Sequence, residues 1–263
     1  MTAEFDLLQP SEWFKGRVAL ATGASSGMGS QIALALGKAG AKVGVHYRGN
    51  REGAESICNQ ITGAGGQASV VQADLSQNDQ VERMFDSLAD AFSSRIDMLV
   101  NNAGDWMDKM PIVECSEAQW DKMFNVNTKS VFLCCRRAAR QMIEQGEGTI
   151  VNIGSVAGLT GGGGGTVPYS AAKSALHGFT FGLARELAPH GIRVNCVAPG
   201  LFDTPMIEGR VDEKVAAAVK RATTLGRIAS PEEIVSTVLM LLSPGASFIT
   251  GQIFSVNGGF HMR

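Results

Sequence analysis

The feature that most constrains the fold is a repeated alternation of short apolar runs with longer segments of helical period. Seven runs have the length and composition of strands: RVALAT (17–22), KVGVHY (42–47), ASVVQAD (68–74), DMLVNNAG (97–104), GTIVNIGS (148–155), IRVNCVAPG (192–200) and GQIFSVNGG (251–259). They are apolar almost throughout, as strands covered on both faces must be. Strands that alternate with helices form βαβ units around a parallel sheet. The sequence therefore predicts an α/β fold, a doubly wound parallel sheet of about seven strands with helices on both faces.

The segments between these runs carry the helical period. Helices are predicted over 30–40, 80–92, 118–143 and 170–188. The connection 201–227 is longer than a crossover needs, and we expect one or two short helices within it. Because ligands of open α/β sheets bind beyond the carboxyl ends of the strands, this segment is placed to act as a substrate-side lid.

Composition excludes several classes of function. The chain has 263 residues, of which 44% are hydrophobic and 18% charged, and no shift in composition marks a joint, so we expect residues 1–263 to form a single domain. The net charge of -2 provides no basic surface for nucleic acid. No run approaches the roughly 18 uncharged apolar residues of a membrane span. The first residues carry acids and a proline where a secretory signal needs a basic start, so we expect a cytoplasmic protein.

The cysteines and histidines indicate neither a disulfide framework nor a metal. The five cysteines, which form no C-x-x-C pair, are Cys58, Cys115, Cys134, Cys135 and Cys196. We expect buried thiols in a reducing compartment. The four histidines are predicted to be bystanders, and no metal site is expected; they are His46, His177, His190 and His261.

A glycine-rich turn, TGASSGMG (22–29), follows the first strand and leads into a helix. Gly23 permits a tight turn, Gly27 allows the backbone to approach a pyrophosphate, and Gly29 allows the helix to pack on the strand. A phosphate there would meet the positive end of the helix dipole. Turns of this kind also occur in folds that bind no nucleotide, so the motif alone leaves both possibilities open.

Tyr169 and Lys173, in YSAAK (169–173), stand four residues apart on a predicted helix, directly after the run GGGGG (161–165). Residues at this spacing share one helix face and can touch. In one interpretation the phenol packs on the core and the ammonium extends to water. In the other the ammonium favours the phenolate and moves the phenol pKa, ordinarily about 10, toward the working range of an acid-base.

Six motifs in order resemble those of the short-chain dehydrogenase/reductase family. They are TGASSGMG (22–29), NNAG (101–104), NVN (125–127), NIGS (152–155), YSAAK (169–173) and APGLFDT (198–204). The likeness is closest to the 3-oxoacyl-carrier-protein reductase type and to similar sugar and carbonyl reductases, down to the ending VNGG. The resemblance implies a Rossmann fold and hydride transfer between a nicotinamide cofactor and a carbonyl or secondary alcohol. The chain departs from the family pattern by an extra residue in the glycine run between Ser155 and Tyr169, a segment expected at the wall of the substrate pocket.

The resemblance implies four catalytic residues. Tyr169 would act as the acid-base, and Lys173 would lower its pKa and hold the nicotinamide ribose. Ser155 would stabilise charge on the substrate oxygen, although a serine at a strand end can simply close a turn. Asn127 would anchor a proton-relay water, although an asparagine within a helix can bond to its own backbone.

The resemblance also implies a set of cofactor-binding residues. The set is Gly23, Ser25, Ser26, Gly27, Met28, Gly29, Arg48, Asp74, Leu75, Asn102, Ala103, Gly104, Tyr169, Lys173, Pro199, Gly200, Phe202 and Thr204. Asp74 would meet the adenine or else cap the helix that follows. Asn102 would meet the adenosine ribose. Thr204 would reach the nicotinamide carboxamide or else start a helix.

The end of the second strand indicates the choice of cofactor. An enzyme selective for NAD needs an acid there to bind the ribose hydroxyl and repel a phosphate. This chain has Tyr47 followed by Arg48, whose guanidinium can bind a phosphate or can be merely solvated. Ser26 stands where many NADP-dependent relatives have arginine. We therefore predict a moderate preference for NADP(H), with NAD(H) possible.

The loops expected to face the pocket indicate the class of substrate. Trp106, Met107, Met110, Phe202 and Met206 lie on loops expected to face the pocket, which suggests a partly apolar substrate such as a 3-oxoacyl thioester. An acyl carrier protein would need a basic patch, for which the candidates are Lys109, Arg210 and Lys214.

Several alternatives and an assembly state accompany this prediction. A sugar or polyol dehydrogenase using NAD(P), a dehydratase or epimerase, and a non-catalytic nucleotide sensor remain alternatives. The C-terminal segment and the helix 118–143 resemble interface segments of the family, so we expect a homotetramer with two-fold axes.

Overall fold

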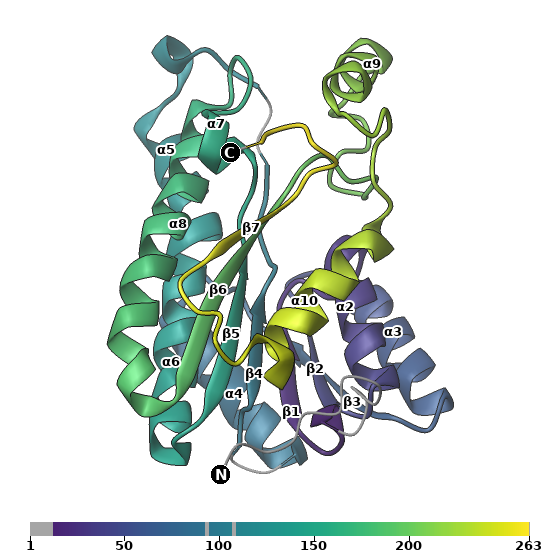
Figure 1. Cartoon of the computed structure of the whole chain (residues 1–263), viewed down its shortest axis with the longest axis vertical. Coiled ribbons are helices and arrows are strands. Elements are labelled where there is room, and N and C mark those ends of the chain that lie inside the picture. Colours follow the sequence, from purple (N-terminus) through teal and green to yellow (C-terminus); the bar gives the residue numbers. More distant parts are fainter. Residues whose placement is uncertain (1–12, 93–94, 107–108, 263) are drawn as a thin grey trace.

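Seven parallel strands form the centre of the molecule. The structure is a computed structural model that describes residues 13–92, 95–106 and 109–262 (Figure 1). The strands lie in the order β3-β2-β1-β4-β5-β6-β7. Their bounds are β1 Val18–Ala21, β2 Lys42–Tyr47, β3 Gln67–Gln72, β4 Met98–Asn101, β5 Gly148–Ile153, β6 Ile192–Pro199 and β7 Ile253–Val256. The predicted doubly wound sheet is confirmed.

Helices cover both faces of the sheet (Figure 1). The α-helices are α2 Gly27–Lys38, α3 Arg51–Gly63, α4 Asn78–Phe92, α5 Glu117–Phe124, α6 Ser130–Gln145, α7 Ala157–Thr160, α8 Val167–Leu187, α9 Glu213–Ala222 and α10 Val235–Leu242. The short helices are η1 Ile112–Glu114, η2 Asn125–Lys129, η3 Ala188–His190, η4 Pro231–Ile234 and η5 Pro244–Ala246. Helices α2, α3 and α10 pack on one face, and α4, α6 and α8 pack on the other.

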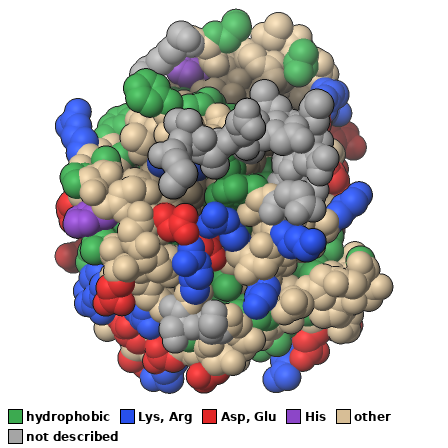
Figure 2. All heavy atoms as spheres, turned by 60° about the horizontal axis from the view of Figure 1, so that its bottom comes forward, with side chains coloured by type: hydrophobic (Ala, Val, Ile, Leu, Met, Phe, Trp, Pro, Cys, Tyr) green, Lys and Arg blue, Asp and Glu red, His purple; other side chains and the backbone are tan. Residues whose placement is uncertain are grey.

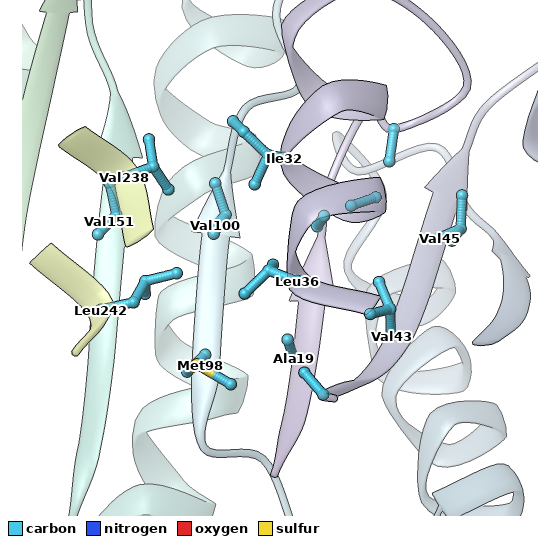
Figure 3. Close-up of a cluster of buried hydrophobic side chains, with 14 of the residues drawn as sticks. Ala19, Ile32, Leu36, Val43, Val45, Met98, Val100, Val151, Val238 and Leu242 are labelled. Carbon is cyan, nitrogen blue, oxygen red and sulfur yellow. The ribbon is translucent and has the colours of Figure 1, made fainter. Parts of the chain in front are cut away.

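Two hydrophobic clusters hold the three layers together. Alternate residues of β1 enter different clusters, Ala19 facing α2 and Leu20 facing α4, because side chains of a strand point to opposite faces in turn. Figure 3 shows Leu36 of α2 reaching toward the strands between Val43 and Met98. Since both faces are covered, the strands need apolar residues in succession, which explains the unbroken apolar runs of the sequence.

The structure differs from the predicted helices in one respect that matters for the site. The helix predicted over 118–143 is divided into α5 and α6 by η2, a π-helical turn at Asn125–Lys129. Such turns insert an extra residue into the helix and occur often at functional sites. The turn lies at the predicted site residue Asn127, so the periodicity located the helix but not its interruption.

The winding of the sheet reverses between β1 and β4, and this point locates the site. Strand β1 pairs with β2 on one side and with β4 on the other. Ligands of doubly wound folds bind beyond the carboxyl ends of the strands at such a point. Helix α9, within the predicted lid segment, lies beyond the same ends of the strands (Figure 1).

The opposite end of the sheet carries charges of both signs. Figure 2 views this end and shows acidic and basic side chains interspersed over it. The buried Asp97 carboxylate accepts a hydrogen bond from Val18 N at 2.8 Å and pairs with Arg95 Nε at 2.6 Å. Within the described residues, every helix is too short or too polar to cross a membrane.

Candidate active site

A cavity of about 660 Å³ opens at the carboxyl ends of the central strands and brings most of the sequence motifs together. Fifteen of the predicted residues line it: Gly23, Ser25, Ser26, Gly27, Met28, Arg48, Asp74, Leu75, Asn102, Ala103, Gly104, Asn127, Tyr169, Lys173 and Thr204. The lid segment contributes Thr204, Pro205, Met206, Glu208 and Arg210. Motif residues as far apart in the sequence as Gly23 and Thr204, which are 181 positions apart (204 − 23), therefore line one cavity.

Five predicted residues lie behind the wall and shape it through packing or backbone contacts. A Cβ at Gly29 would collide with the Gly23 carbonyl, so this glycine serves the packing of α2 on β1. Phe202 is buried in the core rather than exposed to the cavity. The Pro199 carbonyl accepts from Val156 N, and Gly200 N donates to the Val256 carbonyl. Ser155 reaches the site through Tyr169, as described below.

The glycine turn is held against the end of β4 by reciprocal hydrogen bonds. The buried Thr22 Oγ1 accepts from the backbone N–H groups of Asn102 and Ala103, both at 3.0 Å. In return, Asn102 Nδ2 donates to the carbonyls of Thr22 and Gly23, both at 3.0 Å. Gly23 has φ +62°, and a Cβ there would lie 2.9 Å from Ala103 Cα, so only glycine fits. The side-chain amide predicted to meet a ribose thus also fixes the turn.

The start of α2 fits an anion. Ser26 is its N-cap, and its side chain makes no capping hydrogen bond, while the first turn carries no acid. The first backbone N–H groups of a helix lack partners within it and carry partial positive charge. Because Ser26 and Gly27 line the cavity, these groups suit a pyrophosphate, as the nicotinamide dinucleotides require.

His46, which the sequence predicted to be a bystander, lines the cavity and holds the glycine turn. Its Nδ1 accepts from Gly23 N at 2.9 Å, and its Nε2 donates to the Ala73 carbonyl at 3.0 Å. Burial lowers the pKa of His46 to about 4, so the ring is neutral and keeps an acceptor toward the turn. It therefore ties together the ends of β1, β2 and β3. Its position one residue before Tyr47, at the end of a predicted strand, was the available indication.

The Asp74 carboxylate accepts hydrogen bonds within the turn that precedes α4, and Asp74 also lines the cavity. Its Oδ1 accepts from Ser76 N at 3.0 Å and from Ser76 Oγ at 2.7 Å. Burial acts to raise the pKa of Asp74, but the Ser76 hydrogen bonds and the charge of Arg48 outweigh it, so the pKa is lowered. Arg48 lies on the same rim of the cavity, and its carbonyl accepts from Gln72 Nε2 at 3.1 Å.

Ser155, Tyr169 and Lys173 come together where β5 ends and α8 begins. The Ser155 hydroxyl hydrogen-bonds the Tyr169 side chain and accepts from Ala157 N at 3.1 Å. Lys173 Nζ donates to the Ile153 carbonyl at 2.9 Å and lies 5.8 Å from the Tyr169 ring centroid. The Ser155 hydroxyl thus closes the turn that the sequence allowed and also contacts Tyr169, while its role toward a substrate oxygen stays a prediction.

The pKa of Tyr169 moves opposite to the expected direction. Burial raises the pKa, the Ser155 hydrogen bond partly offsets this, and the charge of Asp105 raises it further. The lowering expected from Lys173 is not the dominant effect in this arrangement. Burial also lowers the pKa of Lys173 to about 8. The phenol is therefore protonated and the ammonium still largely charged at neutral pH.

Asn127 occupies the π-helical turn and holds the loop after β4. Its Nδ2 donates to the Asp105 carbonyl at 2.9 Å, and its Oδ1 accepts from Asp105 N at 3.3 Å. Nδ2 also donates to the Met123 carbonyl at 3.1 Å, which is the bond to its own helix that the sequence allowed. A Cβ at Gly104 would lie 2.8 Å from Asn127 Oδ1 and 3.5 Å from Lys173 Nζ. Glycine at 104 thus lets these side chains approach.

The residues predicted to contact an apolar substrate and those predicted to form a basic patch lie in several parts of the structure. Trp106 and Met110 line a small second cavity beside Tyr169, and Met206 lines the large one. Met107 lies outside the described residues. Arg210 pairs with Asp105 at 3.1 Å, while Lys109 and Lys214 are exposed. Among the described residues, no group of three or more histidine, cysteine or acidic side chains could hold a metal.

Known proteins resemble this chain over nearly its whole length. Residues 23–261 match the family model described as enoyl-(acyl carrier protein) reductase. The 3-oxoacyl-[acyl-carrier-protein] reductase of Synechocystis sp. is 40% identical over 247 residues, which cover 94% of this chain and 97% of that protein. The corresponding reductase FabG of Staphylococcus aureus is 39% identical over 244 residues, which cover 93% of this chain and 98% of that protein.

Solved structures of related proteins have the same fold. A dehydrogenase/reductase from Sinorhizobium meliloti superimposes with a TM-score of 0.90 at 34% identity, covering 98% of this chain and 100% of that one. A gluconate 5-dehydrogenase from Burkholderia cenocepacia, in complex with NADP and tartrate, has a TM-score of 0.88 at 32% identity, with coverage of 95% and 98%.

The Thr22 hydroxyl should make a measurable contribution to stability. Thr22→Val keeps the shape of the side chain but removes the hydroxyl acceptor of the Ala103 N–H group and one of the two acceptors of the Asn102 N–H group, which also donates to the Val100 carbonyl at 3.1 Å. We expect the free energy of unfolding to fall by about 1–3 kcal/mol, because unmade buried hydrogen bonds leave desolvation uncompensated. Denaturant unfolding of this variant should be compared with Thr22→Ser, which retains the hydroxyl. Equal stability of the two variants would contradict the assignment.

Proposed function

Because this chain belongs to the short-chain dehydrogenase/reductase family of oxidoreductases, we propose that it reduces a ketone with NADPH, a 3-oxoacyl thioester being the substrate class. The observation that carries the proposal is the contact of Ser155 with Tyr169, one helical turn from Lys173, in a cavity that the glycine turn also lines. The wall of that cavity fits a dinucleotide at the start of α2. The bound nicotinamide would supply hydride to the carbonyl carbon.

The residues around the carbonyl would handle its oxygen. Hydride addition leaves an alkoxide, which requires a proton and stabilisation of negative charge as it develops. Ser155 would donate a hydrogen bond to that oxygen, and Tyr169 would donate the proton. The raised pKa of Tyr169 suits this direction, because the phenol is fully protonated at neutral pH. The Lys173 ammonium would hold the ribose and stabilise the phenolate left after transfer, and Asn127 would anchor the relay water.

Arg48 supports a preference for NADP(H). The end of β2 has Tyr47 and Arg48 in place of an acid, and both line the cavity. A guanidinium there can bind a ribose phosphate through paired hydrogen bonds. One solved relative carries NADP. Arg48 lies close enough for its charge to contribute to the lowered pKa of Asp74. The Asp74 carboxylate in turn reduces the positive potential around Arg48. NAD(H) is therefore proposed as a weaker alternative.

The names of the relatives favour the substrate class without fixing the substrate. Two curated relatives act on 3-oxoacyl groups, as their names say, and the small cavity beside Tyr169 has methionine and proline in its wall. A gluconate 5-dehydrogenase among the solved structures favours a sugar or polyol dehydrogenase as the second candidate, and the Asp105–Arg210 pair at the cavity is polar enough for one. The contacts of Ser155, Asn127 and Lys173 argue against a non-catalytic sensor.

The remaining proposals concern the setting of the site. We propose that the whole chain is one domain whose segment 201–227 covers the substrate, because residues 204–206 of that segment line the cavity. The five free cysteines suit the reducing cytoplasm, where we place the enzyme. We also propose a homotetramer, because apolar side chains are exposed both on α6 and α8 and beside the edge strand β7.

Substitution of Tyr169 tests the proposed acid. Tyr169→Phe removes one hydroxyl, so folding and NADPH binding should stay nearly intact while turnover falls by about two orders of magnitude or more. The measurement is NADPH oxidation with a panel of ketones and 3-oxoacyl thioesters, with NADPH binding followed by fluorescence as the control. Near-normal reduction by this variant would remove Tyr169 from the mechanism.

Substitution of Arg48 tests the choice of cofactor. Arg48→Ala should weaken NADPH binding by about 1–3 kcal/mol and leave NADH little changed, since only the former has the phosphate. Arg83→Ala, which alters an exposed arginine of α4 paired with Asp79, is the control and should change neither. Preference of the unaltered enzyme for NADH, or an equal effect of Arg48→Ala on both cofactors, would count against this proposal.

The exposed face of α8 tests the assembly. Phe181 is 42% exposed, and Phe181→Asp should split the tetramer by placing a charge in an apolar interface. Light scattering should give four times the 27.7 kDa chain mass for the unaltered protein and a smaller assembly for the variant. A single-chain mass for the unaltered protein would exclude the tetramer.

A further inference from the structure

His46 supplies two acceptors, one from its main chain and one from its side chain, to the glycine turn after β1. Its carbonyl accepts from Ala24 N at 2.8 Å, and its ring Nδ1 accepts from Gly23 N at 2.9 Å. The residue before them, Thr22, donates its N–H to the Val100 carbonyl of β4 at 2.9 Å. Three consecutive N–H groups of the turn are thus held by the neighbouring strands, two of them by this one histidine.

The ring takes part because the chain leaves the sheet at Gly23. The backbone pairing of β1 with β2 ends at Ala21 and Val45. Gly23 has φ +62°, a left-handed conformation outside the extended path of a strand. A backbone N–H that is removed from water needs an acceptor, because its desolvation is otherwise uncompensated. The His46 side chain, in a residue only 2% exposed, supplies that acceptor where the main-chain pairing has ended.

These hydrogen bonds also fix the tautomer of the ring. Gly23 N can only donate, so Nδ1 must carry a lone pair. Nε2 then carries the proton, which it donates to the Ala73 carbonyl at 3.0 Å. Burial lowers the pKa of His46 to about 4 and so favours the same neutral ring. A proton on Nδ1 would set a second donor against Gly23 N and remove the contact.

The turn divides at Ala24 into a held part and an open part. Ala24 is fully buried in the hydrophobic cluster between the sheet and α2, whereas residues 25–28 all line the large cavity. Ser26 begins α2 without a side-chain capping bond, and the first N–H groups of a helix have no partner within it. Because the N–H groups of the held part are bound to β2 and β4, those of the open part are available to an anion.

We propose that His46 is a positioning residue for the dinucleotide, which holds the glycine turn so that the start of α2 meets the pyrophosphate. This inference rests on the proposed function in one respect, that the chain binds a nicotinamide dinucleotide. A turn already in its bound conformation binds more tightly, because less order has to be acquired on binding. The pyrophosphate is common to NADPH and NADH, so His46 acts on both, whereas Arg48 is assigned to the ribose phosphate of NADPH alone.

Asparagine and glutamine separate the two ends of the ring. In His46→Asn the side-chain oxygen takes the place of Nδ1, which keeps an acceptor for Gly23 N and loses the bond to Ala73. His46→Gln reaches the Ala73 carbonyl with its amide and leaves Gly23 N without its acceptor. We expect His46→Gln to raise the Kd values of NADPH and NADH alike by about tenfold, as the loss of one hydrogen bond predicts. His46→Asn should keep both values near those of the unaltered protein.

Fluorescence titration of the two dinucleotides gives these Kd values, and denaturant unfolding of the same variants separates positioning from stability. Each variant loses one buried hydrogen bond of the ring, so both should unfold at lower denaturant concentration than the unaltered protein. His190→Gln, which alters an exposed histidine of η3 outside the cavity, is the control and should change neither Kd. Equal losses of affinity in the two His46 variants, or a loss for NADPH alone, would overturn the proposal.

Nitrogen-15 NMR of the histidine-labelled, unaltered protein tests the ring without any need for a variant to fold as the parent does. We expect a neutral ring with its proton on Nε2, with and without NADP⁺, and a proton on Nδ1 would overturn the proposal. None of these measurements requires turnover. A protein that binds both dinucleotides but reduces no ketone would overturn the proposed reductase function and leave the role of His46 standing, whereas a protein that binds neither would overturn both.

Discussion

The hydroxyl of Thr22 joins the two strand ends between which the winding of the sheet reverses. It accepts two backbone N–H groups at the end of β4, and Asn102 returns two hydrogen bonds to the glycine turn. The glycine turn and the end of β4 can approach this closely only because Gly23 and Gly29 have no Cβ. Since the turn directs the start of α2, this contact sets where an anion can bind. His46 supports the same turn from the opposite side.

The second half of the site depends on the π-helical turn between α5 and α6. Asn127 lies in this turn, and its side-chain amide forms hydrogen bonds with both the N–H and the carbonyl of Asp105. Gly104 provides the space for the Asn127 amide and for Lys173 Nζ. One side chain thus connects the helix layer, the end of β4 and the loop that carries Trp106. A substitution of Asn127 would therefore change the surroundings of Tyr169 and the position of the loop that carries Trp106.

Burial favours the neutral form of several ionisable side chains in and near the cavity. It raises the pKa of Tyr169, lowers that of Lys173 to about 8, and lowers those of His46 and His177 to about 4. Each shift favours the neutral form, because a charge loses hydration when it is buried. With a pKa of about 8, Lys173 still carries most of its charge at neutral pH, 5.8 Å from the centroid of the Tyr169 ring. In such a poorly solvated site its interaction with a developing phenolate is stronger than it would be in water.

The sequence by itself determined the layered α/β fold, because strands covered on both faces require apolar residues in succession and helices require their own period. It also located most of the site, since the carboxyl ends of parallel strands meet at one edge and Tyr169 and Lys173 share a helix face. Only the tertiary structure decided the contacts of His46, the π-helical turn at Asn127 and the raised pKa of Tyr169. These depend on partners distant in the chain, and on the desolvation that packing imposes, which no local pattern of residues encodes.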